Sequence, residues 1–127
     1  VLSGMNKVMN GARGTARAAR IEVEGWEMAG KTGTAQVRRI SRKERLEGVR
    51  KTDEKPWEER DHALFVGYAP YSDPRYAVSV IVEHGGSGSS VAAPIARDLL
   101  QETLRLDPLR KPSYDIAIRR QNGGGDV

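Results

Sequence analysis

Apolar positions follow a helical spacing at both ends of the chain. Near the N-terminus they fall on one helical face: Leu2, Met5, Val8 and Met9. This run ends at Asn10-Gly11, a common helix stop. A second stripe follows residue 90: Val91, Ile95, Leu99, Leu100 and Leu104. It predicts a helix that is capped by Ser89 or Ser90 and ends before Pro108.

Between the two helices the apolar residues follow a shorter period. Alternation with polar residues begins at Ile21 and predicts a strand from about residue 26 to residue 37. Residues 63–69 and 76–82 are two runs of apolar, aromatic and β-branched residues. Residues 70–75, which include two prolines, predict a turn that joins these runs as an antiparallel hairpin. We expect the paired strands to be mostly buried on both faces.

A long polar segment separates the first predicted strand from the hairpin. Residues 38–61 carry charges of both signs and predict a solvated loop with a helical turn. The order of elements predicts an α+β fold with three antiparallel strands and flanking N- and C-terminal helices. We assign residues 1–107 to this domain and residues 108–127, which contain three consecutive glycines, to a flexible C-terminal tail.

Composition excludes several classes of protein. With 127 residues, of which 38% are hydrophobic and 30% charged, the chain can bury a core and is not a disordered polymer. The sequence has no cysteine and two histidines, which argues against a disulfide scaffold or a thiolate zinc site, so we expect neither metal nor cofactor. The net charge is +4, and no basic stretch alternates with aromatic residues, so we expect no nucleic-acid partner.

The first predicted strand contains the candidate chemistry. Its segment Lys31-Thr32-Gly33-Thr34 combines a cation, two hydroxyls and a glycine. Such a set suits an anionic ligand, because the polar groups can bind it and Gly33 lets a substrate backbone approach the strand closely. The period of a strand places Thr32 and Thr34 on one face. A motif this short is by itself also typical of an ordinary exposed edge strand.

Three other features have simpler structural interpretations. His62 lies at the start of a predicted strand, where we expect it to make a hydrogen bond. His84 precedes two glycines and is expected to be a turn residue. The Gly/Ser run at residues 85–90 lacks the Lys-Ser/Thr ending of a phosphate-binding loop, so we interpret it as a turn with a helix cap.

Several blocks of sequence together resemble a known family. Residues 31–37, 61–70, 73–78 and 83–86 read KTGTAQV, DHALFVGYAP, DPRYAV and EHGG. In this order they resemble the C-terminal part of the transpeptidase domain of class B penicillin-binding proteins, in particular the penicillin-binding protein 2 type that serves cell elongation. The resemblance runs from about residue 1 to residue 104. In that family Ser-x-x-Lys, Ser-x-Asn and Lys-Thr-Gly motifs converge on one cleft.

The resemblance implies roles for the candidate residues. Lys31 would add positive charge to the cleft, and the hydroxyls of Thr32 and Thr34 would hold the terminal carboxylate of a donor peptide or a β-lactam. The backbone N–H of Thr34 would be one of two oxyanion-hole donors. Lys31 and Thr34 are therefore the candidate catalytic residues, and Thr32, Gly33 and Thr34 the candidate substrate-binding residues.

The resemblance also implies a function for a longer protein. Neither Ser-x-x-Lys nor Ser-x-Asn occurs in the chain, so we expect the serine nucleophile to lie upstream and the chain alone to be an inactive fragment. The parent would be a D,D-transpeptidase at the periplasmic face of the bacterial inner membrane that cross-links peptidoglycan stem peptides through a serine acyl-enzyme. Its partners would be D-Ala-D-Ala stem peptides, β-lactams and membrane proteins of the elongation complex.

Two alternatives and one further expectation remain. The chain could belong to a β-lactam-sensing or binding module without turnover, or to a basic domain that binds nucleic acid. Saturable binding to single-stranded DNA at physiological salt would favour the second. The resemblance also implies that the strand at residues 76–82 would pair with an N-terminal strand that these 127 residues lack. We therefore expect an unpaired edge there and self-association of the chain, either by edge pairing or by element exchange.

Overall fold

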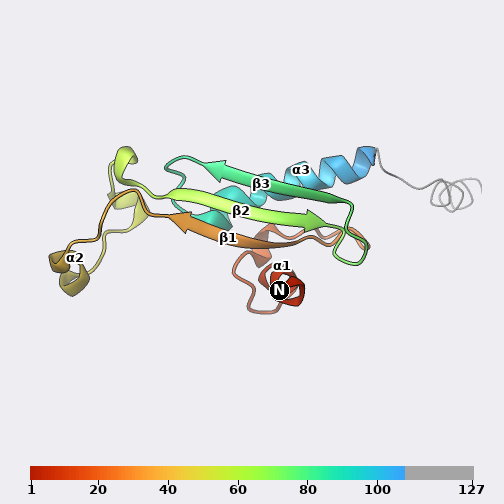
Figure 1. The fold of residues 1–127 in the computed structure, drawn as a ribbon, viewed down its shortest axis with the longest axis horizontal. Helices are drawn as coiled ribbons and strands as arrows, with labels where there is room; N and C mark the ends of the chain where they lie inside the picture. The colour runs from red at the N-terminus through yellow and green to blue at the C-terminus, as the bar shows by residue number, and fades with distance from the viewer. Residues whose placement is uncertain (108–127) are drawn as a thin grey trace, which may run out of the picture.

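The computed structural model describes residues 1–107, whose helices and strands confirm the α+β class (Figure 1). The main elements are α1 (Leu2–Asn10), β1 (Ala29–Ala35), α2 (Arg42–Glu47), β2 (His62–Ala69), β3 (Tyr76–Val82) and α3 (Ala93–Leu106). Shorter turns are the 3₁₀ segments η1 (Arg17–Ala19), η2 (Thr52–Glu54) and η3 (Trp57–Glu59), and the π-helical turn η4 (Gly88–Ala92). The predicted tail at 108–127 lies outside the described residues.

The three strands form one antiparallel sheet in the order β1-β2-β3. β2 therefore lies in the centre, while β1 and β3 are its two edges in this part of the chain. The β2–β3 connection is the predicted hairpin, and its register pairs Ala69 with Tyr76 and Ala63 with Val82. Because β3 has an unpaired edge within residues 1–107, self-association through that edge stays a prediction.

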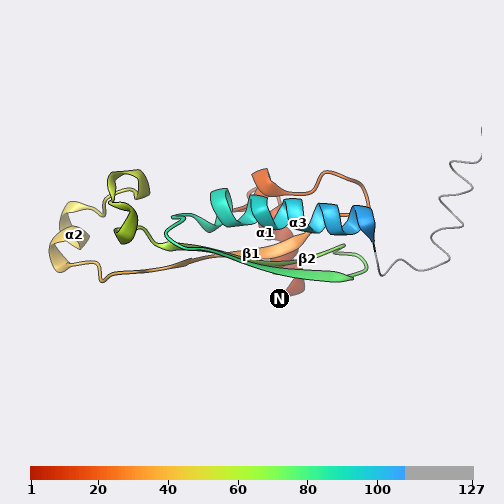
Figure 2. The same ribbon diagram turned by 90° about the horizontal axis from the view of Figure 1, so that it is seen from above.

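One face of the sheet is covered by α3 (Figure 2). The β2 residues Ala63, Phe65 and Ala69 point to the covered face and are fully buried. On α3 the buried positions lie three or four residues apart: Ala93, Ala96, Leu100 and Leu104. The two alanines are small enough to let the helix approach the sheet closely around Phe65. The core thus sits between α3 and one face of the strands, with α1 beside β1 (Figure 1).

Two predictions about burial are wrong. The hairpin strands are not buried on both faces, because Val66 on β2 is 47% exposed and Ile81 on β3 is 65% exposed. Ile95 and Leu99, which belong to the predicted apolar stripe of the last helix, are also exposed. Within the described residues, α3 covers only one face of the sheet, and the sheet covers only one face of α3. The spacing of apolar residues does not show which face is covered.

The first strand is shorter than predicted. β1 covers Ala29–Ala35 rather than 26–37, because the flanking backbone groups bond elsewhere. The Glu27 carbonyl accepts the Tyr71 N–H at 2.7 Å, and the Met28 carbonyl accepts the Asn10 side-chain amide at 2.9 Å. At the other end the Val37 N–H donates to the Asp61 carboxylate instead of to β2.

The connections next to β1 and α3 also differ in detail from the sequence patterns. The segment 38–61 extends beyond the end of the sheet, and it contains α2 and two 3₁₀ turns, so the predicted helical turn is confirmed (Figure 1). The predicted cap of the last helix at Ser89 or Ser90 is wrong. α3 begins after Ala92 without a side-chain cap, and the Ser87 hydroxyl instead caps the preceding turn η4 by accepting the Ser90 N–H. No helix within residues 1–107 has the length and apolarity needed to cross a membrane.

Candidate functional site

The candidate segment Lys31-Thr32-Gly33-Thr34 lies in the middle of the edge strand β1. The start of β1 is buried beside α1, and the strand becomes accessible from Lys31 onward. Lys31 and Thr34 are exposed, while Thr32 and Gly33 are half-buried. The structure therefore brings all four residues together on an accessible strand edge, as the sequence predicted.

The pairing with β2 shows how the side chains divide between the two faces. Thr32 pairs with Phe65 and Thr34 with Ala63, so the two hydroxyls share the face that α3 covers. Lys31 pairs with Val66 and therefore lies on the opposite face, where its ammonium donates to the Thr32 carbonyl at 2.7 Å. A ligand along this edge can be met by hydroxyls from one face and by a cation from the other.

A side chain would have more space at Gly33 than at Gly30, the other glycine of β1. A Cβ at Gly30 would lie 2.1 Å from the Phe65 ring, so packing against the core requires glycine there. A Cβ at Gly33 would meet the Leu64 Cβ at 3.3 Å and nothing closer. Within residues 1–107, packing therefore does not require glycine at position 33 as strictly as it does at position 30. This agrees with a glycine that keeps the strand open to a ligand.

The Gly/Ser run at residues 85–90 packs behind Gly33, a contact that the sequence patterns did not indicate. Gly88, the first residue of η4, is buried against the backbones of β1 and β2. A Cβ at this position would lie 2.6 Å from the Gly33 carbonyl oxygen and 2.5 Å from that of Leu64. Glycine at position 88 therefore permits the turn after β3 to support the candidate strand from behind.

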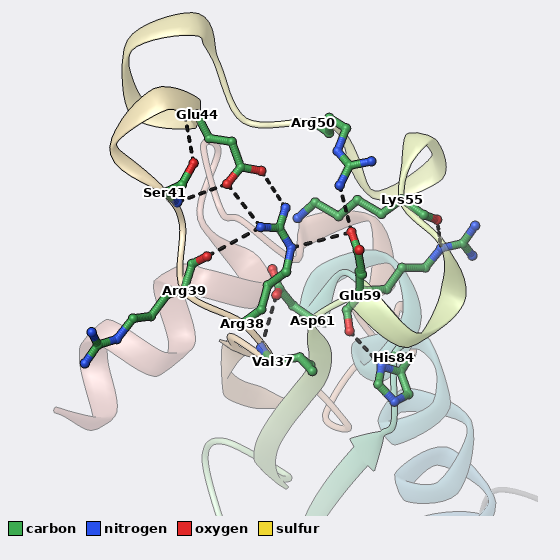
Figure 3. Close-up of polar contacts among 11 residues, drawn as sticks. Val37, Arg38, Arg39, Ser41, Glu44, Arg50, Lys55, Glu59, Asp61 and His84 are labelled. Carbon is green, nitrogen blue, oxygen red and sulfur yellow. Dashed lines mark hydrogen bonds and ion pairs between the residues drawn. The ribbon is translucent and has the colours of Figure 1, made fainter.

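An ion-pair network organises the charged segment that follows β1 (Figure 3). The Arg38 guanidinium binds both Glu44 carboxylate oxygens, at 2.6 and 3.1 Å, and approaches Glu59 at 3.5 Å. Ser41 caps α2 and shares Glu44 with Arg38. The hydrogen bond from Arg38, supported by the one from Ser41, lowers the pKa of Glu44 to about 2. Much of the segment is therefore ordered by its own charges, although it is solvated.

The two histidines meet at the base of this segment. His62 opens β2, and its Nδ1 accepts the His84 N–H at 2.9 Å, so the predicted hydrogen bond at the strand start is confirmed. His84 has a φ of 53°, and the turn prediction is confirmed as well. The His84 ring lies 4.3 Å from the Trp57 ring and 4.8 Å from the His62 ring. Their contact across 22 residues gave no signal in the sequence.

The family model of the penicillin binding protein transpeptidase domain matches residues 1–101, a stretch that includes the candidate strand, the hairpin and most of α3. The chain belongs to this family. Its relatives and structural neighbours identify it further as a class B penicillin-binding protein sequence of the penicillin-binding protein 2 type.

Two curated relatives of this penicillin-binding protein sequence carry the name peptidoglycan D,D-transpeptidase MrdA. The protein from Haemophilus influenzae is 38% identical over 93% of this chain, and the one from Acinetobacter baumannii is 36% identical over 87%. The match covers 17% and 15% of the two relatives, so the chain spans about a sixth of their length.

Solved penicillin-binding proteins have the same arrangement of elements. PBP2 from Pseudomonas aeruginosa, solved in complex with WCK 5153, matches 88% of this chain and 21% of its own, with 40% identity and a TM-score of 0.60. PBP2 from Helicobacter pylori, solved in complex with MreC, matches 80% of this chain and 16% of its own, with 28% identity and a TM-score of 0.61. The three-stranded sheet and its helices are therefore part of a penicillin-binding protein transpeptidase fold.

Proposed function

We propose that this chain forms one wall of the active site of a peptidoglycan D,D-transpeptidase, which cross-links stem peptides through a serine acyl-enzyme. The observation that supports the proposal is the accessible edge strand Lys31-Thr32-Gly33-Thr34 in a chain of the penicillin-binding protein family. Edge strands offer backbone donors and acceptors to an extended peptide, which is the form in which a stem peptide would lie along β1.

The residues of β1 have distinct roles in this proposal. The hydroxyls of Thr32 and Thr34 hold the terminal carboxylate of the donor peptide, and Lys31 adds positive charge and a proton donor to the cleft. The Thr34 backbone N–H donates to the oxyanion that forms when the serine attacks the carbonyl. Loss of one oxyanion donor typically raises the barrier by about 2.7–4 kcal/mol, but a backbone donor persists when the side chain is replaced.

In this proposal the serine nucleophile and the Ser-x-Asn motif lie outside these 127 residues, since neither motif occurs in the sequence. The 127-residue chain alone is then inactive. Family membership supports a place at the periplasmic face of the inner membrane. The complex of the Helicobacter pylori relative with MreC supports membrane proteins of the elongation complex as partners.

Covalent labelling with a fluorescent penicillin tests the proposal. We expect a labelled band for the full-length protein and none for the 127-residue chain. Thr34→Ala in the full-length protein should raise the penicillin concentration required for half-maximal labelling while leaving the limiting acylation rate nearly unchanged, because the oxyanion donor at Thr34 is a backbone group.

Two outcomes would contradict this assignment. A labelled 127-residue chain would mean that one of its own serines is the nucleophile, and an unlabelled full-length protein would exclude the acyl-enzyme. Labelling without any cross-linking of stem peptides would instead support the alternative, a module that binds or senses β-lactams without turnover.

A further inference from the structure

The turn between β3 and α3 touches both the candidate strand and the charged segment 38–61. At its end Gly88 packs against the backbone of Gly33. In its middle the Gly86 N–H donates to the Asp61 carbonyl at 2.9 Å, and a Cβ on Gly86 would lie 2.3 Å from the Thr52 methyl group. Any movement of this turn therefore reaches both the strand and the segment.

Hydrogen bonds determine the protonation of the two histidines that hold this turn. The His84 N–H can only donate, so His62 Nδ1, which receives it at 2.9 Å, carries no proton. The Arg60 carbonyl can only accept, so His84 Nδ1, 2.8 Å away, carries one. A second proton on His62 would have to occupy the nitrogen that accepts the bond. His62 therefore makes this contact only as a neutral imidazole.

The His84 ring also contacts two other rings. The centroids of Trp57 in η3 and of His62 in β2 lie 4.3 and 4.8 Å from it. The positive φ of His84 places its N–H toward β2, a conformation that most residues avoid. The segment 52–61, the start of β2 that follows it and the turn after β3, which lies 22 residues further along the chain, thus converge on this pair.

The pair lies at the end of the strand that carries the candidate residues. His62 is the β2 partner of Ala35, and the next pair in the ladder is Ala63 with Thr34. Asp61, adjacent to His62, accepts the Val37 N–H at 3.4 Å where β1 leaves the sheet. His62 thus lies one residue pair away from Thr34 in the ladder, and the turn that His62 contacts packs behind Gly33 through Gly88.

The charged groups around the pair are exposed or have other partners. The Asp61 carboxylate accepts from Val37, and Glu59 pairs with Arg38 and Arg50 (Figure 3). The Arg60 guanidinium donates to the Lys55 carbonyl at 3.2 Å. Glu83, which precedes His84, is exposed. The hydrogen bond between His62 and the turn is thus governed by the proton on His62 itself.

We propose that His62 is a positioning residue that holds the turn 84–88 and the segment 38–61 against the substrate strand only while it is neutral. Protonation of His62 removes the acceptor for the His84 N–H and loosens the turn behind Gly33. Thr32 and Thr34 then bind the carboxylate end of a peptide less tightly. This inference rests on the transpeptidase function proposed above.

Two replacements of His62 distinguish the role of its hydrogen-bond acceptor from that of its protonation. His62→Asn places an amide oxygen on the same carbon that carries Nδ1, and this oxygen accepts at every pH tested. His62→Phe keeps a ring but offers no acceptor. His84→Asn is the matched control, because asparagine tolerates a positive φ and keeps the backbone N–H while removing the other titratable ring.

The test measures acylation of the full-length protein by a penicillin between pH 8 and about pH 5.5, a range that spans ordinary histidine titration. For the wild type and His84→Asn we expect apparent affinity to fall by about fivefold or more toward acid, with the limiting acylation rate unchanged. His62→Asn should lose that dependence, and His62→Phe should have the low affinity already at pH 8.

Hydrogen exchange provides a second readout that does not depend on activity. After correction for intrinsic rates, residues 38–61 and 84–88 should exchange faster at acid pH in the wild type, but not in His62→Asn. A wild type that is not acylated at any pH would refute the proposed function. The role of His62 would instead be overturned if the wild type is acylated normally and His62→Asn keeps the wild-type pH dependence. It would also be overturned if His62→Phe has the same affinity for penicillin and the same hydrogen exchange as the wild type.

Discussion

Removal of the buried charge at the end of α3 provides the sharpest test of how the hairpin is held to the helix. The Asp107 carboxylate accepts from Arg75 Nη1 at 2.6 Å and from the Tyr76 hydroxyl at 3.0 Å. The Asp107 and Arg75 side chains are 5% and 16% exposed. Asp107 also has a φ of 38°, which asparagine tolerates, so Asp107→Asn removes the charge without a new backbone conflict.

The expected loss follows from this geometry. Breaking a buried ion pair costs about 3–5 kcal/mol, because the remaining charge is left without a partner in a poorly hydrated place. Arg75 retains 16% exposure, so water reaches part of the guanidinium, and we expect a value near the lower limit, about 3 kcal/mol. Asp107→Ala should lose more, since it also gives up the Tyr76 hydrogen bond, worth about 1 kcal/mol, and places alanine at a positive φ.

Urea unfolding, followed by circular dichroism, measures both variants against a control on the same helix. Glu102 pairs with Arg105 at 2.6 Å, but their side chains are 58% and 62% exposed, so Glu102→Gln should cost less than about 1 kcal/mol. Removing both charges, as Arg75→Met with Asp107→Asn, should cost less than Asp107→Asn alone, because no unpaired charge is left and asparagine tolerates the positive φ of position 107. If Asp107→Asn costs no more than Glu102→Gln, the reasoning from burial is wrong.

Three further predictions concern the segments around the candidate strand. Arg38 lowers the pKa of Glu44 from 4.5 to about 2, so the stability from this contact should be complete above pH 4.5 and lost as the pH falls through about 2. A carboxyl shift titration by NMR with a midpoint near 4.5 would contradict this. Gly88→Ala, whose Cβ would lie 2.5 Å from the Leu64 carbonyl, should cost about 1–3 kcal/mol in thermal unfolding. Gly4→Ala in α1, with no atom within 4 Å, should instead stabilise by about 0.5–1 kcal/mol.

Local patterns were sufficient for much of this structure. The spacing of apolar residues predicted α1, the hairpin strands and the end of α3, since helices and strands repeat over a few residues. The candidate strand could be recognised because its chemistry is contiguous: Lys31, Thr32, Gly33 and Thr34 are neighbours in the chain. Their accessibility on an edge strand then agreed with the prediction.

Contacts between distant residues were decided by the tertiary structure alone. Alternation along β2 and β3 cannot tell which face a helix will cover, and so Val66 and Ile81 were wrongly expected to be buried. The approach of Gly88 to Gly33, the bond between His62 and His84, and the pairing of Arg75 with Asp107 each join residues at least 22 positions apart. The sequence carries no short-range record of such contacts, because each joins elements that lie side by side only in the folded structure.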